Sequence, residues 1–129
     1  MACLQLTWDG FEAAVDIIAA MVDHPQNLSG VYGGTDIGRF LAVAVAYRLG
    51  MSTLEVPSPG MLLVDGAVDN DEVLKVLAGY EESQAWVWVD ATGESLYNSV
   101  MKVGPGMQVS YPWEDALSCR ELFIGGLHD

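Results

Sequence analysis

Four acidic side chains follow one apolar segment of this chain. Residues 61–64 are Met-Leu-Leu-Val, and Asp65, Asp69, Asp71 and Glu72 come soon after them. A short apolar run without polar alternation is typical of a central strand in a parallel sheet. Carboxylates grouped beyond such a strand can collect Mg²⁺ or Ca²⁺, although this run lacks the ligand spacing of an EF-hand. We therefore expect a polar binding site at this end of the strand.

A glycine-rich segment separates residues 29–32, where we expect a strand, from residues 37–49, where we expect a helix. Its candidate ligand-contacting residues are Gly33, Gly34, Thr35, Asp36 and Gly38. In parallel α/β sheets, ligands bind beyond the C-terminal ends of the strands. This segment and residues 65–72 each follow a strand and precede a helix, so the sequence predicts that they line one shared crevice.

The order of the other elements predicts an α/β fold. Thr7 is a suitable N-cap for a first helix, and the helix at residues 37–49 is apolar throughout, which predicts burial against a sheet. Further elements are expected as a strand at 53–56, a helix at 71–80, a strand at 85–89, and a hairpin of residues 99–103 and 108–111. The alternation predicts a three-layer α/β domain with a mostly parallel sheet and a small hood or hairpin near the C-terminus. Residues 1–129 are expected to form a single domain.

The charge of the chain restricts its partners. Eighteen acidic residues against five basic ones give a formal net charge of −13. Such a surface repels nucleic acid backbones and anionic membranes, so we expect neither direct nucleic-acid binding nor membrane association. The charge serves either for solubility alone or as an acidic face that mimics nucleic acid or docks on a basic partner.

Three observations favour a cytoplasmic protein. The apolar run at residues 40–47 is too short to span a bilayer, and the N-terminus lacks the basic and apolar segments of a signal peptide. Cys3 and Cys119 lie near opposite ends of the sequence and have neither metal-binding nor redox spacing. We therefore expect two reduced thiols.

Several segments together resemble one enzyme family. Val64, Asp65 and Asp69 form a Val-Asp-x-x-x-Asp skeleton between an expected strand and helix. Residues 6–9, residues 31–50 and the Tyr-Pro-Trp-Glu of residues 111–114 add to the similarity. Over residues 6–115 the chain resembles small type I phosphoribosyltransferases, nearest to the bacterial xanthine/guanine type and its short phage-like relatives.

The resemblance implies a role for several residues. Asp65 and Asp69 would hold the ribose hydroxyls of phosphoribosyl diphosphate; the alternative is that these two acids cap the next helix. Trp113 would stack on the purine base, unless it is an ordinary packed tryptophan, and Lys102 would contact a purine carbonyl. Glu114 and Asp115 beside Trp113 are weak candidate metal ligands.

Both phosphate-binding segments depart from the family pattern. Asp36, Ile37 and Gly38 stand where relatives have an Arg-Gly-Gly-like stretch, so a positive charge has become negative. The phosphate cradle, Thr-Gly-Lys-Thr-like in relatives, is here Asn70, Asp71, Glu72 and Val73, and Gly66 stands where relatives usually have Asp. A cradle for phosphate needs free amides, hydroxyls or a cation. A reversal of charge worth several kcal/mol corresponds to about a thousandfold loss of affinity.

The sequence therefore predicts a degenerate phosphoribosyltransferase-like protein. It would be a catalytically impaired module that binds a nucleobase, a nucleotide-like ligand or a protein partner, and its small size is compatible with a phage origin. The alternatives are an active purine phosphoribosyltransferase that uses phosphoribosyl diphosphate and Mg²⁺, and an acidic inhibitor that mimics nucleic acid.

The resemblance also implies association of two copies. The small residues at positions 42–46 would permit close contact between the helices of a homodimer. The alternative is that this small-residue run is buried under the sheet.

Overall fold

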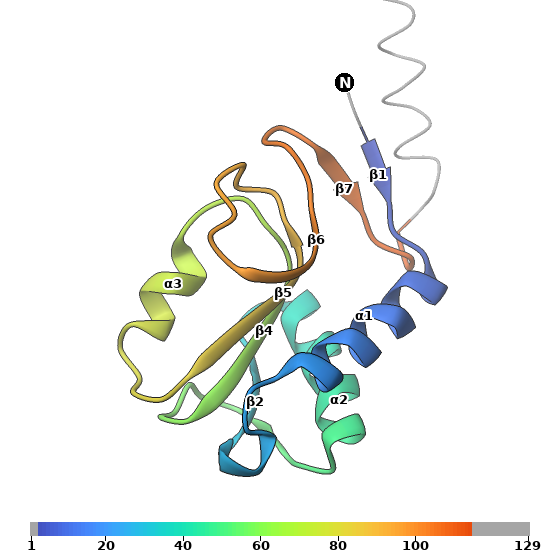
Figure 1. Cartoon of the computed structure of the whole chain (residues 1–129). Helices are drawn as coiled ribbons and strands as arrows, with labels where there is room; N and C mark the ends of the chain where they lie inside the picture. The colour runs from blue at the N-terminus through green and yellow to red at the C-terminus, as the bar shows by residue number, and fades with distance from the viewer. Residues whose placement is uncertain (1–2, 115–129) are drawn as a thin grey trace, which may run out of the picture.

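The computed structural model describes residues 3–114 (Figure 1). The elements follow one another as β1 (Cys3–Gln5), α1 (Trp8–Met21), the 3₁₀ turn η1 (Pro25–Asn27), β2 (Gly30–Gly33), α2 (Asp36–Leu49), β3 (Thr53–Leu54), β4 (Met61–Val68), α3 (Glu72–Leu77), β5 (Gln84–Asp90), β6 (Asn98–Lys102) and β7 (Gln108–Ser110). The alternation of strands and helices that the sequence predicts is therefore confirmed.

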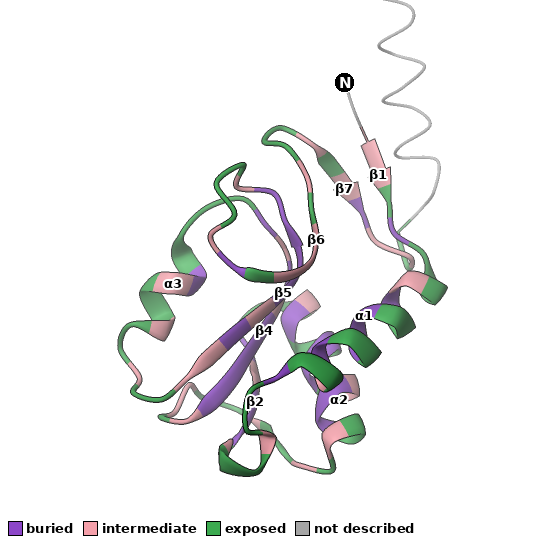
Figure 2. Ribbon diagram, viewed as in Figure 1, coloured by how far each residue is buried: buried purple, intermediate pink, exposed green. Residues whose placement is uncertain are grey.

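The main sheet has five parallel strands in the order β3-β2-β4-β5-β6. Helices α1 and α2 lie on one face of it and α3 lies on the other (Figure 1). The predicted three-layer α/β fold with a mostly parallel sheet is confirmed. Strands β4 and β5 at the centre are largely buried, as the purple segments in Figure 2 show.

Local sequence signals fix the ends of the two long helices. The hydroxyl oxygens of Thr7 and Thr35 accept hydrogen bonds from the amides of Gly10 and Gly38, which caps α1 and α2. Gly50 ends α2 with φ of 70°, a conformation that glycine adopts without steric cost. These signals position the glycine-rich segment at the start of α2.

Strand β4 is longer than the four apolar residues predict. It continues to Val68, because Ala67 and Val68 pair with Val89 and Asp90 of β5. Asp65 therefore lies within the strand, and the turn that precedes α3 begins only at Asp69.

The predicted hairpin of residues 99–103 and 108–111 is wrong. β6 pairs with β5 in the main sheet, whereas β7 pairs in parallel with β1 in a separate two-stranded sheet. The segment between them crosses from one sheet to the other, and Pro105 packs against Gly93, where an added Cβ would lie 2.9 Å from the Pro105 Cδ. The strand pattern and the turn residues were visible in the sequence, but the pairing partners were not.

Cys3 is disulfide-bonded, so the prediction of two reduced thiols is wrong for this residue. Cys119 lies outside the described residues.

No helix among residues 3–114 has both the length and the apolar composition needed to cross a membrane. The cytoplasmic location stays a prediction.

Candidate functional site

One crevice, with a volume of about 230 Å³, lies where the two predicted loops meet. It is lined by Thr35, Ile37, Asp65, Ala67, Val68, Asp69, Asn70, Glu72, Val73 and Tyr111. These residues come from the segment after β2, from the end of β4 and the turn that follows it, and from the residue after β7. The structure thus brings together the two segments that the sequence predicted to share a crevice.

Adjacent strands position the Asp65 carboxylate. Gly33 and Val64 are paired residues of β2 and β4, so Thr35 and Asp65 lie just beyond this pair. The Thr35 hydroxyl donates to Oδ1 of Asp65 at 2.6 Å, and the Gly66 amide donates to the same oxygen at 2.8 Å. Oδ2 takes part in neither hydrogen bond. The carboxylate is therefore oriented by the protein while one oxygen stays outside these two contacts.

Close packing explains two glycines of the first segment. A Cβ on Gly33 would lie 2.1 Å from the carbonyl carbon of Gly38, and a Cβ on Gly38 would lie 2.8 Å from the carbonyl oxygen of Val64. Both distances are too short for any side chain. These two glycines thus allow the start of α2 to approach the sheet.

The absence of a side chain at Gly66 has a similar cause. A Cβ there would lie 2.5 Å from Cγ2 of Ile37 and 2.5 Å from the hydroxyl oxygen of Tyr111. That hydroxyl accepts a hydrogen bond of 2.8 Å from the amide of Ala67. Ile37 and Tyr111 therefore occupy the space that a second acid in this strand would need.

Sequence reasoning did not assign a role in the crevice to either Ile37 or Tyr111. The role of Ile37 could have been inferred from a branched residue at a position where the resembled family has glycine. That of Tyr111 could have been inferred from its position directly before Pro112-Trp113. Burial raises the pKa of Tyr111, and the negative charges of Asp65 and Glu114 raise it further. Tyr111 is therefore a neutral hydroxyl group in the crevice at neutral pH.

The turn after β4 is held by hydrogen bonds of one of its own side chains, Asn70. Oδ1 of Asn70 accepts from the Glu72 amide at 3.0 Å, and Nδ2 of Asn70 donates to Asp69 at 3.1 Å. The Tyr97 hydroxyl holds the turn through a 2.7 Å hydrogen bond to the carbonyl oxygen of Asn70. The side chain of Asn70 thus accepts the hydrogen bond from the first amide of α3. The alternative role of Asp65 and Asp69 as caps of this helix does not match these contacts.

The charges that line the crevice have one sign. Asp65, Asp69 and Glu72 are among its lining residues, which include no lysine or arginine. Asp71 lies beside them in sequence, and its carboxylate is 3.4 Å from the Lys75 amine along α3. Such an environment disfavours a phosphate group.

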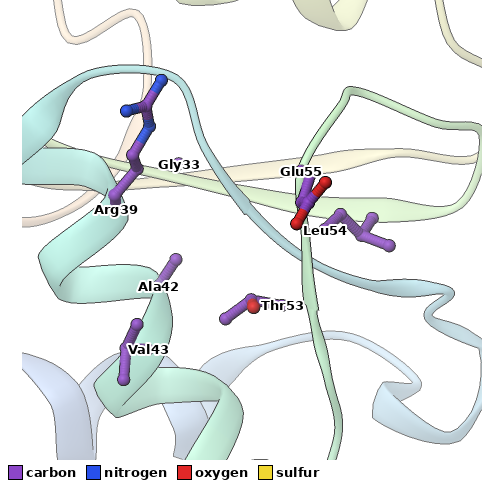
Figure 3. Close-up of a pocket in the computed structure, with 7 residues that line it drawn as sticks. All are labelled: Gly33, Arg39, Ala42, Val43, Thr53, Leu54 and Glu55. Carbon is purple, nitrogen blue, oxygen red and sulfur yellow. The ribbon is translucent and has the colours of Figure 1, made fainter.

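Arg39, the nearest cation in the sequence to the first segment, does not line the crevice. Its guanidinium lies 3.8 Å from the carboxylate of Asp36, and both side chains are largely exposed. Figure 3 shows Arg39 in a different pocket, between α2 and β3, opposite Glu55. Arg39 therefore does not replace the missing positive charge.

The predicted base-binding residues lie outside the crevice lining. Trp113 stacks on Tyr111 with ring centroids 5.2 Å apart and planes 2° apart, and it also contacts Phe40 and Trp8. The Lys102 amine donates to the Ser99 hydroxyl at 2.9 Å at the edge strand β6. Their roles toward a purine stay predictions.

The candidate metal ligands receive no support from geometry. Glu114 is exposed at the end of the described chain, and Asp115 lies outside it. Within residues 3–114, no three carboxylate, histidine or cysteine side chains lie close enough to hold a metal ion. The side chains that the structure describes therefore do not fit a resident Mg²⁺.

No protein-family model matches the sequence, and no curated protein is similar to it. Solved structures are similar in fold. A purine phosphoribosyltransferase from Pyrococcus horikoshii has a TM-score of 0.71 at 16% identity, with 89% of this chain and 96% of that chain covered. A xanthine-guanine-hypoxanthine phosphoribosyltransferase from Helicobacter pylori has a TM-score of 0.68 at 12% identity, with 93% and 97% covered.

A third structure is a hypothetical protein from Neisseria gonorrhoeae with bound ppGpp, which has a TM-score of 0.61 at 14% identity, with 97% of each chain covered. These identities are low, so the similarity concerns the backbone, and it extends over nearly the whole of each structure. The chain therefore has the fold of type I phosphoribosyltransferases.

Proposed function

We propose that this protein is a catalytically impaired phosphoribosyltransferase-like binding protein, whose crevice accepts an uncharged purine nucleoside rather than a phosphorylated sugar. One observation carries the proposal: the crevice is lined by the carboxylates of Asp65, Asp69 and Glu72 and by no basic side chain. Sugar hydroxyl groups donate hydrogen bonds to carboxylates, whereas phosphate oxygens are repelled by them.

Electrostatics and shape both argue against phosphoribosyl transfer. Two like charges 4 Å apart near a protein surface repel by about 4 kcal/mol. Ile37 and Tyr111 also fill the space above Gly66. The Asn70 side chain accepts a hydrogen bond from the Glu72 amide, which is one of the donors that a phosphate cradle would use.

The oriented carboxylate of Asp65 supports ribose recognition. Hydrogen bonds from Thr35 and Gly66 hold Oδ1, and an acceptor that is already oriented loses little conformational entropy when a ligand binds. A volume of about 230 Å³ is below the range of about 300–1,000 Å³ typical of sites for drug-sized ligands. The crevice thus suits the sugar, and the base would extend toward the Tyr111–Trp113 pair.

The purine part of the proposal rests on the names of the structural neighbours. Two of them are phosphoribosyltransferases for purines, and the third contains bound ppGpp. A polyphosphate such as ppGpp carries the type of charge that the carboxylates of this crevice repel, so we do not extend that ligand to this chain.

Calorimetric titration with guanosine, GMP, and phosphoribosyl diphosphate plus Mg²⁺ tests the proposal. We expect guanosine to bind most tightly and the sugar diphosphate most weakly. Asp65→Asn should weaken guanosine binding about tenfold or more, since a hydrogen bond to a charged acceptor contributes roughly 1.5–3 kcal/mol. Asp71→Asn is the matched control: it removes the same charge outside the crevice lining and should leave binding unchanged.

A second measurement separates binding from catalysis. Labelled guanine incubated with phosphoribosyl diphosphate, Mg²⁺ and the protein should give no labelled nucleotide. Formation of nucleotide, or tighter binding of the sugar diphosphate than of guanosine, would show that the transferase function is retained. If none of the three compounds binds, the assignment of a nucleoside ligand is wrong.

A further inference from the structure

Helix α2 is buried on one side only, which differs from the burial that its apolar composition predicts. The small-residue run at positions 42–46 lies largely inside the fold. On the other side, Phe40 and Val43 expose 48% and 63% of their surface, and Trp8 at the start of α1 exposes 51%. Large apolar side chains that gather at a protein surface often mark a ligand-binding groove or an interface.

A hollow of about 540 Å³ lies between α1 and α2 at these exposed side chains, and we call it the helix hollow. Its volume is typical of sites for small ligands. Both helices contribute to its lining, which consists of Trp8, Phe11, Glu12, Phe40, Val43 and Ala44. The helix hollow is separate from the crevice, since the two share no lining residue.

An ion pair bounds one end of the helix hollow. The two helices meet first where the ring of Trp8 contacts that of Phe40, with centroids 6.1 Å apart. Two turns later, the Asp16 carboxylate of α1 pairs with the Arg48 guanidinium of α2. Each of these two residues comes four positions after the last lining residue of its helix. The ion pair therefore joins the helices one turn beyond the hollow.

The ring of Trp113 bounds the other end. It contacts both helices, with its centroid 5.7 Å from that of Trp8 and 5.0 Å from that of Phe40. A partner helix laid along the groove would need to continue past this ring or past the ion pair. A hollow that is bounded in this way suits a compact ligand better than a segment of another protein.

One carboxylate faces the apolar lining. Glu12 is the charged residue among the described residues that line the hollow. The three ion pairs of residues 3–114 involve other acids, and no hydrogen bond within this part of the chain reaches the Glu12 carboxylate. The net charge of −13 adds a long-range attraction for cations and a repulsion for anions. Glu12 is therefore available to pair with a positively charged ligand.

The aromatic rings of the hollow also favour a cation. The planes of Trp8 and Phe11 meet at 75° and those of Phe11 and Phe40 at 62°, so the rings differ in orientation. Rings inclined in this way contact a rounded group more fully than a flat one. The face of an aromatic ring attracts positive charge, most strongly for tryptophan. Trp8 and Phe40 are each about half exposed, so part of each ring is accessible to a ligand.

We propose that the helix hollow binds a small organic cation with apolar substituents, of the class of quaternary and tertiary ammonium compounds. The positive charge pairs with Glu12, and the apolar substituents pack on Trp8, Phe40 and Val43. An uncharged apolar molecule would leave the Glu12 carboxylate without a partner, and an anion would be repelled by it. The inference does not depend on any ligand in the crevice.

Titration with benzyltrimethylammonium, followed by tryptophan fluorescence and by calorimetry, tests the proposal. We expect this cation to bind about tenfold more tightly than benzyl alcohol, which carries the same ring without a charge. Phenylacetate, which carries the ring with a negative charge, should bind more weakly than either. Benzyl alcohol that binds as tightly as the cation overturns the assignment of a cationic ligand.

Variants of the lining locate the bound cation. Glu12→Gln should weaken its binding about fivefold and leave that of benzyl alcohol unchanged, while Glu81→Gln, at an exposed glutamate in the turn after α3, is the matched control. Trp8→Leu keeps an apolar side chain but removes the ring, and it should weaken binding of the cation about fivefold. Tyr47→Leu is its control, since Tyr47 is an exposed aromatic residue of α2 outside the lining. Thermal denaturation checks that the variants are folded.

Three outcomes overturn the proposal. The first is that the cation does not bind, or that Glu12→Gln and Trp8→Leu bind it as tightly as the parent chain does. The second is a loss of binding in Asp65→Asn but not in Glu12→Gln, which would place the cation in the acidic crevice. The third, seen by sedimentation velocity with and without the cation, is a dimer that excludes it, which would show that a second copy occupies the helix hollow.

Discussion

Asp65 lies within strand β4 and Asp90 ends the neighbouring strand β5, and their surroundings differ. Asp65 is half-buried and lines the crevice, and Thr35 and Gly66 donate only to its Oδ1. Asp90 is 1% exposed. Its Oδ1 accepts from the amide and the hydroxyl of Thr92, and its Oδ2 accepts from the Tyr97 amide at 3.1 Å.

These contacts show which acid is available to a ligand. Burial by itself raises the pKa of Asp90, but the hydrogen bonds from Thr92 and Tyr97 outweigh it, and the net effect is a pKa below the ordinary value. The charge of Asp90 is thus satisfied inside the protein, and the residue holds the loop between β5 and β6. Asp65 keeps an oxygen outside the two internal hydrogen bonds, as a binding residue must.

Replacing Asp90 should have the largest effect on stability. Asp90→Ala leaves the Thr92 and Tyr97 amides without their acceptor, and we expect the free energy of unfolding to fall by about 3 kcal/mol. Urea denaturation measures this change. Asp69→Ala, at an exposed position in the crevice, should change stability by no more than about 0.5 kcal/mol. Equal losses in the two variants would show that the distinction between a structural and an available acid is wrong.

Adding an acid next to Asp65 should have the second largest effect. Gly66→Asp must displace Ile37 and Tyr111, and overpacking of this kind costs about 2 kcal/mol. Ile37→Ala removes one of the two obstacles and should recover part of the loss in the double variant. Thermal denaturation of the four proteins in a double-mutant cycle gives the coupling. Strictly additive effects would mean that Ile37 does not exclude the second acid.

The hydroxyl of Tyr111 should have a smaller effect. Tyr111→Phe removes the acceptor for the Ala67 amide while keeping the ring that stacks on Trp113, and we expect a loss of about 1 kcal/mol. Tyr47→Phe, at an exposed tyrosine, is the control and should leave stability unchanged. No loss for Tyr111→Phe would show that water replaces this hydroxyl.

The smallest predicted effect is on how the free energy of unfolding decreases at acid pH. Since the pKa of Asp90 is lowered in the folded state, its ionised form contributes stability above the unfolded pKa of about 3.9, and this contribution is lost as the pH falls through the folded value. Asp90→Asn lacks this dependence. The stability of the variant, measured by urea denaturation from about pH 5 to pH 2, should therefore decrease less steeply than that of the parent chain.

The sequence predicted which segments form the crevice better than it predicted which side chains fill the space above Gly66. The strand–glycine–helix pattern at residues 33–38 and the acids after residue 64 indicated two segments at one edge of a sheet, and the structure brings them together. The obstruction above Gly66 by Ile37 and Tyr111 was not predictable, because neither residue is near Gly66 in the sequence, and Tyr111 is 45 residues away and follows a strand of the other sheet.

By itself, the sequence determined most of the elements of the main sheet and the sign of the charge in the crevice. Threonine caps and unbroken apolar runs act within a few residues, so the cap at Thr7 could be assigned without the fold. Only the tertiary structure decided that β7 pairs with β1 and that one side of α2 is exposed. These outcomes depend on contacts between distant segments, which no local pattern of residues specifies.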